Sequence, residues 1–230
     1  KEALNIVNGI NYDFKKSEVK IVVCPPNILI PYLSKRLEQK KIFLGAQDCS
    51  HESKGAFTGD ISSEMLEESD CSFVIVGHSE RRSLKGENSE LVKAKSLQAI
   101  KHNLTPIICV GETKLVREKN DQYNFIKKQL MDSIPIDQEN KNSKIIIAYE
   151  PMWAIGTGKV PAISEISKMH KFIKSLLSDL GDKLEVIYGG SVNGSNSFDI
   201  LSDKYVDGLL VGGASINYNE FNKIINNAGK

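Results

Sequence analysis

Short runs of apolar, mostly β-branched residues recur along this chain of 230 residues, and stretches with helical periodicity separate them. The runs expected to form strands are Val19–Cys24, Ile42–Ala46, Phe73–Gly77, Pro106–Val110, Lys144–Tyr149, Val186–Tyr188 and Gly208–Val211. The stretches expected to form helices are Leu29–Gln39, Glu87–His102, Tyr123–Ser133, Ile163–Leu180, Asn196–Leu201 and Asn219–Asn226. Strands that are apolar throughout and alternate with helices are typical of a parallel sheet with both faces covered. The sequence therefore predicts an α/β protein.

Two arrangements of such a sheet compete, an open doubly wound sheet and a closed (β/α)8 barrel. The pattern GxGxxG, which favours the open sheet, does not follow the first run. A barrel typically takes about 250 residues. Seven runs fall one short of eight, but Lys1–Val7 has the pattern of an amphipathic helix that a strand should precede. We therefore expect residues 1–230 to form a single (β/α)8 barrel domain that lacks its first strand.

The bulk composition argues against several classes of protein. With 30 basic and 29 acidic residues the formal charge is +1, which predicts no general affinity for nucleic acid or for an anionic membrane. The cysteines Cys24, Cys49, Cys71 and Cys109 lie far apart without a CxxC pair, which argues against a structural metal site. No apolar run approaches the roughly 20 residues needed to span a bilayer. We expect a cytoplasmic protein with reduced thiols.

One glutamate stands at the end of a strongly apolar run. Residues 145–149 are apolar and lead directly to Glu150, and Pro151 ends the strand because it has no N–H to donate. Beyond it, a short segment with Gly156 and Gly158 is small enough to move as a unit. A lone glutamate at a strand end is more often a solvated charge. The combination instead predicts a catalytic carboxylate beneath a lid.

A histidine follows another of the predicted strands. His78 precedes Ser79 and Glu80, which are typical of the first turn of a helix. The positive end of the helix dipole favours neutral imidazole, which can donate a hydrogen bond to a carbonyl oxygen. The other histidines match no motif and are expected at the surface: His51, His102 and His170.

Paired glycines follow the last two predicted strands, where many barrels bind phosphate. Gly189 and Gly190 come before Ser191, and Gly212 and Gly213 follow the final run. Glycine lets backbone N–H groups approach an anion closely without any charged side chain. Either pair alone could equally be a simple turn from strand to helix. Together they predict a phosphate site in a nearly neutral chain.

Two long stretches carry a family resemblance. Residues 148–159, AYEPMWAIGTGK, resemble a signature of the triosephosphate isomerase family with Met152 as the single change, and residues 75–82, IVGHSERR, resemble a second signature. The resemblance extends over essentially the whole chain. It implies interconversion of dihydroxyacetone phosphate and D-glyceraldehyde 3-phosphate, by proton transfer through an enediolate, without cofactor or metal.

The resemblance also assigns roles to individual residues. Glu150 would be the base, His78 the electrophile, and Glu80 the partner of a catalytic lysine. The phosphate-binding residues would be Gly156, Ser191, Gly212 and Gly213. The family further implies a homodimer in which the loop 55–62 inserts into a second subunit, and Phe57 between the glycines of this loop fits such a contact.

The sequence departs from the family pattern in one serious respect. The family carries Asn-x-Lys at the end of its first strand, and Lys1 lies a few residues too late to match it. The catalytic lysine is therefore absent from the sequence. Two alternatives remain open at this point: a phosphate-binding or interaction protein, and a different phosphosugar isomerase or epimerase, which the segment around Glu150 disfavours.

Overall fold

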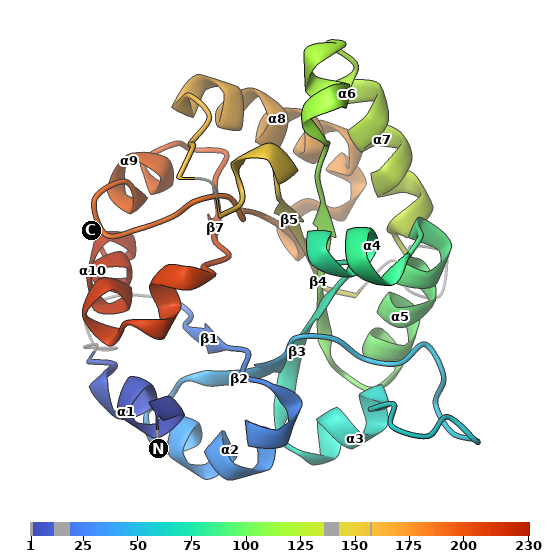
Figure 1. Cartoon of the computed structure of the whole chain (residues 1–230), viewed down its shortest axis with the longest axis vertical. Coiled ribbons are helices and arrows are strands. Elements are labelled where there is room, and N and C mark those ends of the chain that lie inside the picture. The colour runs from blue at the N-terminus through green and yellow to red at the C-terminus, as the bar shows by residue number, and fades with distance from the viewer. Residues whose placement is uncertain (1, 12–18, 136–142, 157) are drawn as a thin grey trace.

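The computed structural model of this protein describes residues 2–11, 19–135, 143–156 and 158–230. Its centre is one parallel sheet whose strands stand in chain order. They are β1 (Val22–Val23), β2 (Phe43–Ala46), β3 (Cys71–Val76), β4 (Thr105–Val110), β5 (Ile145–Tyr149), β6 (Leu184–Tyr188) and β7 (Gly208–Leu209). The sheet curls round on itself and the helices lie outside it (Figure 1). The barrel prediction and each of the predicted strands are thus confirmed.

The two ends of the sheet differ from its middle. In the part of the chain that the structure describes there are seven strands, so β1 and β7 each pair with one neighbour only. Each is two residues long and partly exposed. Strands β3 to β6 pair on both sides, and nearly all of their residues are buried.

Helices connect the strands on the outside of the sheet. They are α1 (Glu2–Gly9), α2 (Ile30–Gln39), α3 (Ser63–Glu68), α4 (Ser79–Lys85), α5 (Ser89–Lys101), α6 (Lys114–Glu118), α7 (Gln122–Ser133), α8 (Ile163–Leu176), α9 (Ser197–Leu201) and α10 (Tyr218–Ala228). Short 3-10 helices are η1 (Asn27–Leu29), η2 (Met152–Ala154), η3 (Ser178–Lys183) and η4 (Gly213–Ile216). Helices α3 and α6, which are only one to two turns long, were not predicted from the sequence. Helix α8 ends at Leu176, earlier than the predicted Leu180.

Both faces of the sheet are buried, in two separate apolar clusters. The cluster inside the barrel contains Phe73, Ile75, Ile107, Cys109, Ile146, Ala148 and Ile187. The alternate residues of the same strands, such as Val74, Ile108 and Ile147, pack beneath the helices in the larger cluster. This two-sided burial explains why the strands are apolar at every position rather than at every second one.

The four cysteines are all free thiols. Cys49, Cys71 and Cys109 are buried, and Cys24 is partly exposed. Burial raises the pKa of Cys24 and Cys71 to about 12 and that of Cys49 to about 11. It also raises the pKa of Cys109 well above 9.0. All four thiols are therefore protonated at neutral pH.

Candidate active site

Glu150 lies at the carboxyl end of β5 and is almost completely buried, with its side chain 2% exposed. Its N–H donates to the Val110 carbonyl oxygen at 2.8 Å, so the pairing with β4 continues through it. Glycines on both neighbouring strands make room for it. A Cβ at Gly111 would lie 1.7 Å from the Glu150 carbonyl oxygen, and one at Gly189 would lie 2.9 Å from its Cγ. Backbone packing thus fixes where this carboxylate can be.

Both oxygens of the Glu150 carboxylate have partners. Oε1 lies 3.0 Å from His78 Nε2, and Oε2 accepts the backbone N–H of Ser79 at 3.0 Å. Ser79 is the first residue of α4, where N–H groups have no partner within the helix and the dipole favours a negative charge. The Cys109 thiol is close enough to Glu150 that the carboxylate adds to the burial that raises the thiol's pKa. The carboxylate is therefore held at the start of α4, by the residue that caps this helix and by its first N–H.

His78 caps α4, and this fixes which of its ring nitrogens carries a proton. Nδ1 accepts the Glu80 N–H at 3.4 Å, so Nδ1 is unprotonated in this arrangement. A neutral ring then carries its proton on Nε2, which faces Glu150. The hydrogen bond with Glu150 raises the pKa of His78 above the ordinary 6.5, and burial opposes that rise. A single Nε2–H donor is thus aimed at the base.

Glu80, the third residue assigned to catalysis, lies apart from this pair. Its side chain is 73% exposed, and Oε2 is 3.9 Å from His78 Nδ1, on the opposite edge of the ring from Glu150. Among the described residues its carboxylate has no lysine partner. The role of Glu80 stays a prediction.

The predicted phosphate-binding residues lie on loops that follow β5, β6 and β7. Ser191 donates its hydroxyl to the Ala154 carbonyl oxygen at 2.6 Å, which joins the loop after β6 to η2. Gly156 has φ +64°, in the left-handed region, and a Cβ there would meet nothing within 4 Å. Gly212 and Gly213 are exposed, and a Cβ on either would also meet nothing within 4 Å. Gly212 precedes η4 and Gly213 is its first residue, so their backbone N–H groups lie at the start of this helix. The segment 155–161, here called the lid segment, includes Thr157, which lies outside the described residues.

Two further side chains support the site and were not singled out by the sequence analysis. Arg82 donates to the carbonyl oxygens of Gly77 and Cys109, at 2.9 and 3.1 Å, and so joins the ends of β3 and β4. Glu112, which is fully buried, accepts hydrogen bonds from Tyr149 Oη at 3.1 Å and Trp153 Nε1 at 2.9 Å. For Glu112, the one available signal was its place shortly after a strand, because Tyr149 and Trp153 lie 37 and 41 positions away in sequence.

The expectation that His170 is a surface residue is wrong, because its side chain is 0% exposed. It lies on α8 beneath β5 and β6, edge-on to Tyr149, and its Nδ1–H donates to the Tyr205 carbonyl oxygen at 3.2 Å. Burial lowers the pKa of His170 to about 4. The ring is therefore a neutral core group. His51, in contrast, is exposed as expected.

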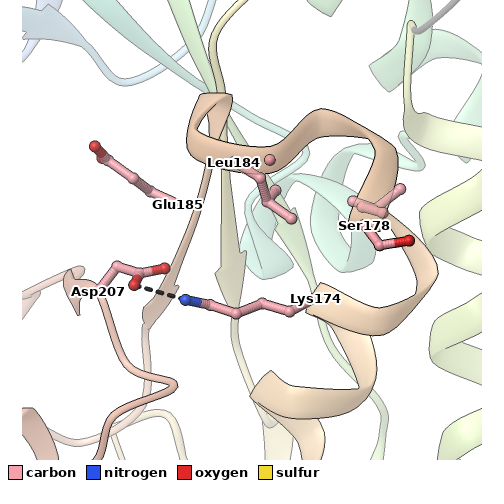
Figure 2. A pocket seen from close by; sticks show the side chains of 7 residues that line it. Lys174, Ser178, Leu184, Glu185 and Asp207 are labelled. Atoms are coloured by element: carbon pink, nitrogen blue, oxygen red, sulfur yellow. Dashed lines mark hydrogen bonds and ion pairs between the residues drawn. The ribbon is translucent and has the colours of Figure 1, made fainter.

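A surface groove of about 540 Å³ lies at the other end of the barrel (Figure 2). It is lined by Lys174, Leu177, Ser178, Gly181, Leu184, Glu185 and Asp207. Leu184 begins β6 at its amino end, whereas Glu150 and the glycine loops follow carboxyl ends of strands. The Lys174–Asp207 ion pair, at 2.6 Å, crosses the groove (Figure 2). This groove is therefore separate from the candidate active site.

Over the residues that the structure describes, no helix is long and apolar enough to cross a membrane. Within the same residues, no cluster of three or more histidine, cysteine, aspartate or glutamate side chains is arranged to hold a metal ion.

Comparisons with known proteins give a consistent result. The family model described as triosephosphate isomerase matches residues 1–228. A triosephosphate isomerase from Alkaliphilus oremlandii is 42% identical over 231 residues, covering 98% of this chain and 93% of the relative. One from Endomicrobium trichonymphae is 41% identical, covering 91% of this chain and 85% of the relative. The crystal structure of triosephosphate isomerase from Bartonella henselae superimposes with a TM-score of 0.85 at 36% identity, covering all of this chain and 92% of the other.

Proposed function

Because the chain belongs to the triosephosphate isomerase family, we infer that it interconverts dihydroxyacetone phosphate and D-glyceraldehyde 3-phosphate, a reaction of glycolysis and gluconeogenesis. Within the site, the observation that best supports this function is the contact of 3.0 Å between Glu150 Oε1 and His78 Nε2. It lies where the carboxyl ends of β3 and β5 meet, which is where enzymes with this fold carry out their chemistry.

Glu150 is the proposed base. It takes a proton from the carbon next to the substrate carbonyl and returns it to the neighbouring carbon. His78 donates its Nε2–H to the oxygens of the enediolate; this pairing of glutamate and neutral histidine is the established one for the family. The Ser79 N–H orients Oε2, which keeps a second lone pair that can accept the proton.

The phosphate group of the substrate is assigned to Gly156, Ser191, Gly212 and Gly213. The exposed N–H groups at the start of η4 suit a dianion, because they carry partial positive charge and need no lysine or arginine. The hydroxyl contact of Ser191 with Ala154 links these loops to the lid segment, so binding of phosphate and closure of the lid are expected to occur together.

A reaction in deuterated water tests the function directly. The purified protein is given D-glyceraldehyde 3-phosphate, and the product is followed by NMR. Proton transfer through Glu150 predicts dihydroxyacetone phosphate that carries deuterium at carbon 1. A product without deuterium would contradict the assigned base. If the protein binds glycerol 3-phosphate but forms no product, the alternative of a phosphate-binding protein is favoured.

The protein is further proposed to be a homodimer through the loop 55–62. Phe57 on this loop is 43% exposed, and Ile28 and Leu84, on the connections that follow β1 and β3, are 87% and 76% exposed. Large apolar side chains exposed on the connections after three consecutive strands favour a protein partner. Light scattering should give about twice the chain mass of 25.5 kDa, and Phe57→Asp should reduce it to the mass of one chain. A single-chain mass for the parent would exclude the dimer.

A cytoplasmic location is proposed as well. Four free thiols and a reaction of central sugar metabolism favour a reducing compartment. Fractionation of the source cells tests it, and recovery of the protein outside the cytoplasmic fraction would contradict it.

A further inference from the structure

One side chain of α6 contacts both ends of the lid segment. This side chain is Arg117, and the two ends are Trp153 in η2 and the amino terminus of α8. The catalytic roles assigned above do not use Arg117, and its helix is one that the sequence analysis did not predict. Its contacts therefore call for a separate explanation.

At the first end, Arg117 lies over the ring of Trp153, with Cζ 5.6 Å from the ring centroid. The indole Nε1–H donates to Glu112 Oε1 at 2.9 Å, and Arg117 NH1 is 3.7 Å from the same oxygen. The ring is thus held through both its face and its edge. Cation–π contacts of this kind are strongest where they are shielded from water, and the Arg117 side chain is only 21% exposed.

At the second end, Arg117 NH2 makes an ion pair with Glu165 Oε1. The other oxygen of Glu165 accepts the N–H of Ala162 at 3.0 Å and so caps α8. Ala162 directly follows Pro161, the last residue of the lid segment. The guanidinium is therefore joined to the point where the lid segment enters α8.

We propose that Arg117 is a positioning residue that clamps the two ends of the lid segment and so keeps Gly156 in place for the substrate phosphate. Holding both η2 and the start of α8 limits how far Gly156 can move away from the phosphate that it is proposed to bind. Arg117 acts through Trp153 and Glu165 and touches no reacting atom. The inference rests on the isomerase function proposed above.

Trp153 is the only tryptophan of the chain, so its fluorescence reports on one end of the lid segment without any label. Arg117→Ala should shift the emission to longer wavelength and reduce its response to glycerol 3-phosphate. It should also weaken glycerol 3-phosphate binding and lower kcat/KM, each about fivefold, which is the upper range for a partly exposed ion pair. Glu165→Gln should act in the same direction but less, because an amide oxygen can still cap Ala162. The double variant should be no worse than Arg117→Ala.

A matched control removes an ion pair from the opposite end of the barrel. Lys174→Ala breaks the 2.6 Å pair with Asp207 on the same helix, α8, and should leave the emission, ligand binding and kcat/KM unchanged (Figure 2). The proposal is overturned if Arg117→Ala behaves like the parent, or if Lys174→Ala reduces ligand binding and kcat/KM as much as Arg117→Ala does. It is also overturned if the effects of Arg117→Ala and Glu165→Gln on kcat/KM are additive in the double variant. If Arg117→Ala does not fold, Arg117→Lys and Glu165→Gln carry the same test. An inactive parent would instead refute the isomerase function, so the two failures are distinct.

Discussion

The middle strands of the sheet and its last strand, β7, lead into two different parts of the candidate site. Strands β3 to β5 position His78 and Glu150, whose contacts with each other and with Ser79 are buried and close to 3.0 Å. Strand β7 leads instead into Gly212 and Gly213, which are exposed and surrounded by open space. The proton-transfer half is thus fixed before substrate arrives, whereas the phosphate half is left open.

This difference follows from what each half has to do. Proton transfer requires donor and acceptor atoms to lie within hydrogen-bond distance in one orientation, so fixed packing is an advantage. A phosphate dianion can be bound by several N–H groups from different directions, and the open space around the glycines suits such a ligand. Substitutions in the two halves should therefore impair different properties of the protein.

The largest effect is expected where the base itself is changed. Glu150→Gln keeps an oxygen that can accept the Ser79 N–H but cannot remove a proton, so kcat should fall about 10³-fold or more while KM changes little. Steady-state kinetics on the folded variant measures both. Glu150→Asp, which retracts the carboxylate without losing it, should lie between this variant and the parent. Equal losses in kcat and in substrate affinity would contradict the assignment.

Next come two glycines, one from each half. Gly111→Ala places a methyl group 1.7 Å from the Glu150 carbonyl oxygen and should lower the free energy of unfolding by about 3 kcal/mol or more. Gly212→Ala meets nothing within 4 Å, so stability should be unchanged, while KM rises about tenfold because the methyl group takes up space meant for phosphate. Urea unfolding measures the stability of both variants, and steady-state kinetics measures their KM. If Gly212→Ala lowers the stability as much as Gly111→Ala does, the expected difference between the two glycines is wrong.

His170 should make the middle of the barrel sensitive to acid. Its pKa is about 4 in the folded protein and ordinarily 6.5, so the unfolded chain binds its proton more readily. The loss of folding stability caused by His170 is absent above pH 6.5 and grows as pH falls towards 4, where it reaches about 3 kcal/mol. His170→Asn, whose amide can still donate to Tyr205, should flatten this part of the stability profile. The same pH dependence in parent and variant would exclude His170 as its source.

The smallest expected effect concerns the titration of His78. NMR should find its pKa above 6.5, and Glu150→Gln should lower it, because the contact with Glu150 is the main cause of the rise. A raised pKa stabilises the folded protein below the ordinary pKa of 6.5, and this stabilisation is lost as pH rises through the folded-state value. An unchanged pKa in the variant would mean that the two side chains are not in contact in solution.

The sequence predicted the strands and the residues at their ends well, because buried parallel strands are apolar at every position and the chemistry follows each of them directly. It could not predict that Ser79 holds Glu150, since that contact joins residues 71 positions apart. The burial of His170 could have been found. Ile166, Met169 and Ile173 form an apolar stripe on α8, and His170 lies within it at helical spacing. Treating the histidine by residue type rather than by position caused the error.

The four protonated thiols have a practical consequence for labelling experiments. Maleimides and other thiol reagents attack thiolates, and burial keeps the native cysteines in the unreactive form at neutral pH. A single cysteine introduced in an exposed turn, for example in place of Ser202, should therefore be labelled selectively without removing any native cysteine. The chain can in this way carry one fluorophore or spin label at a chosen position while its core remains as evolved.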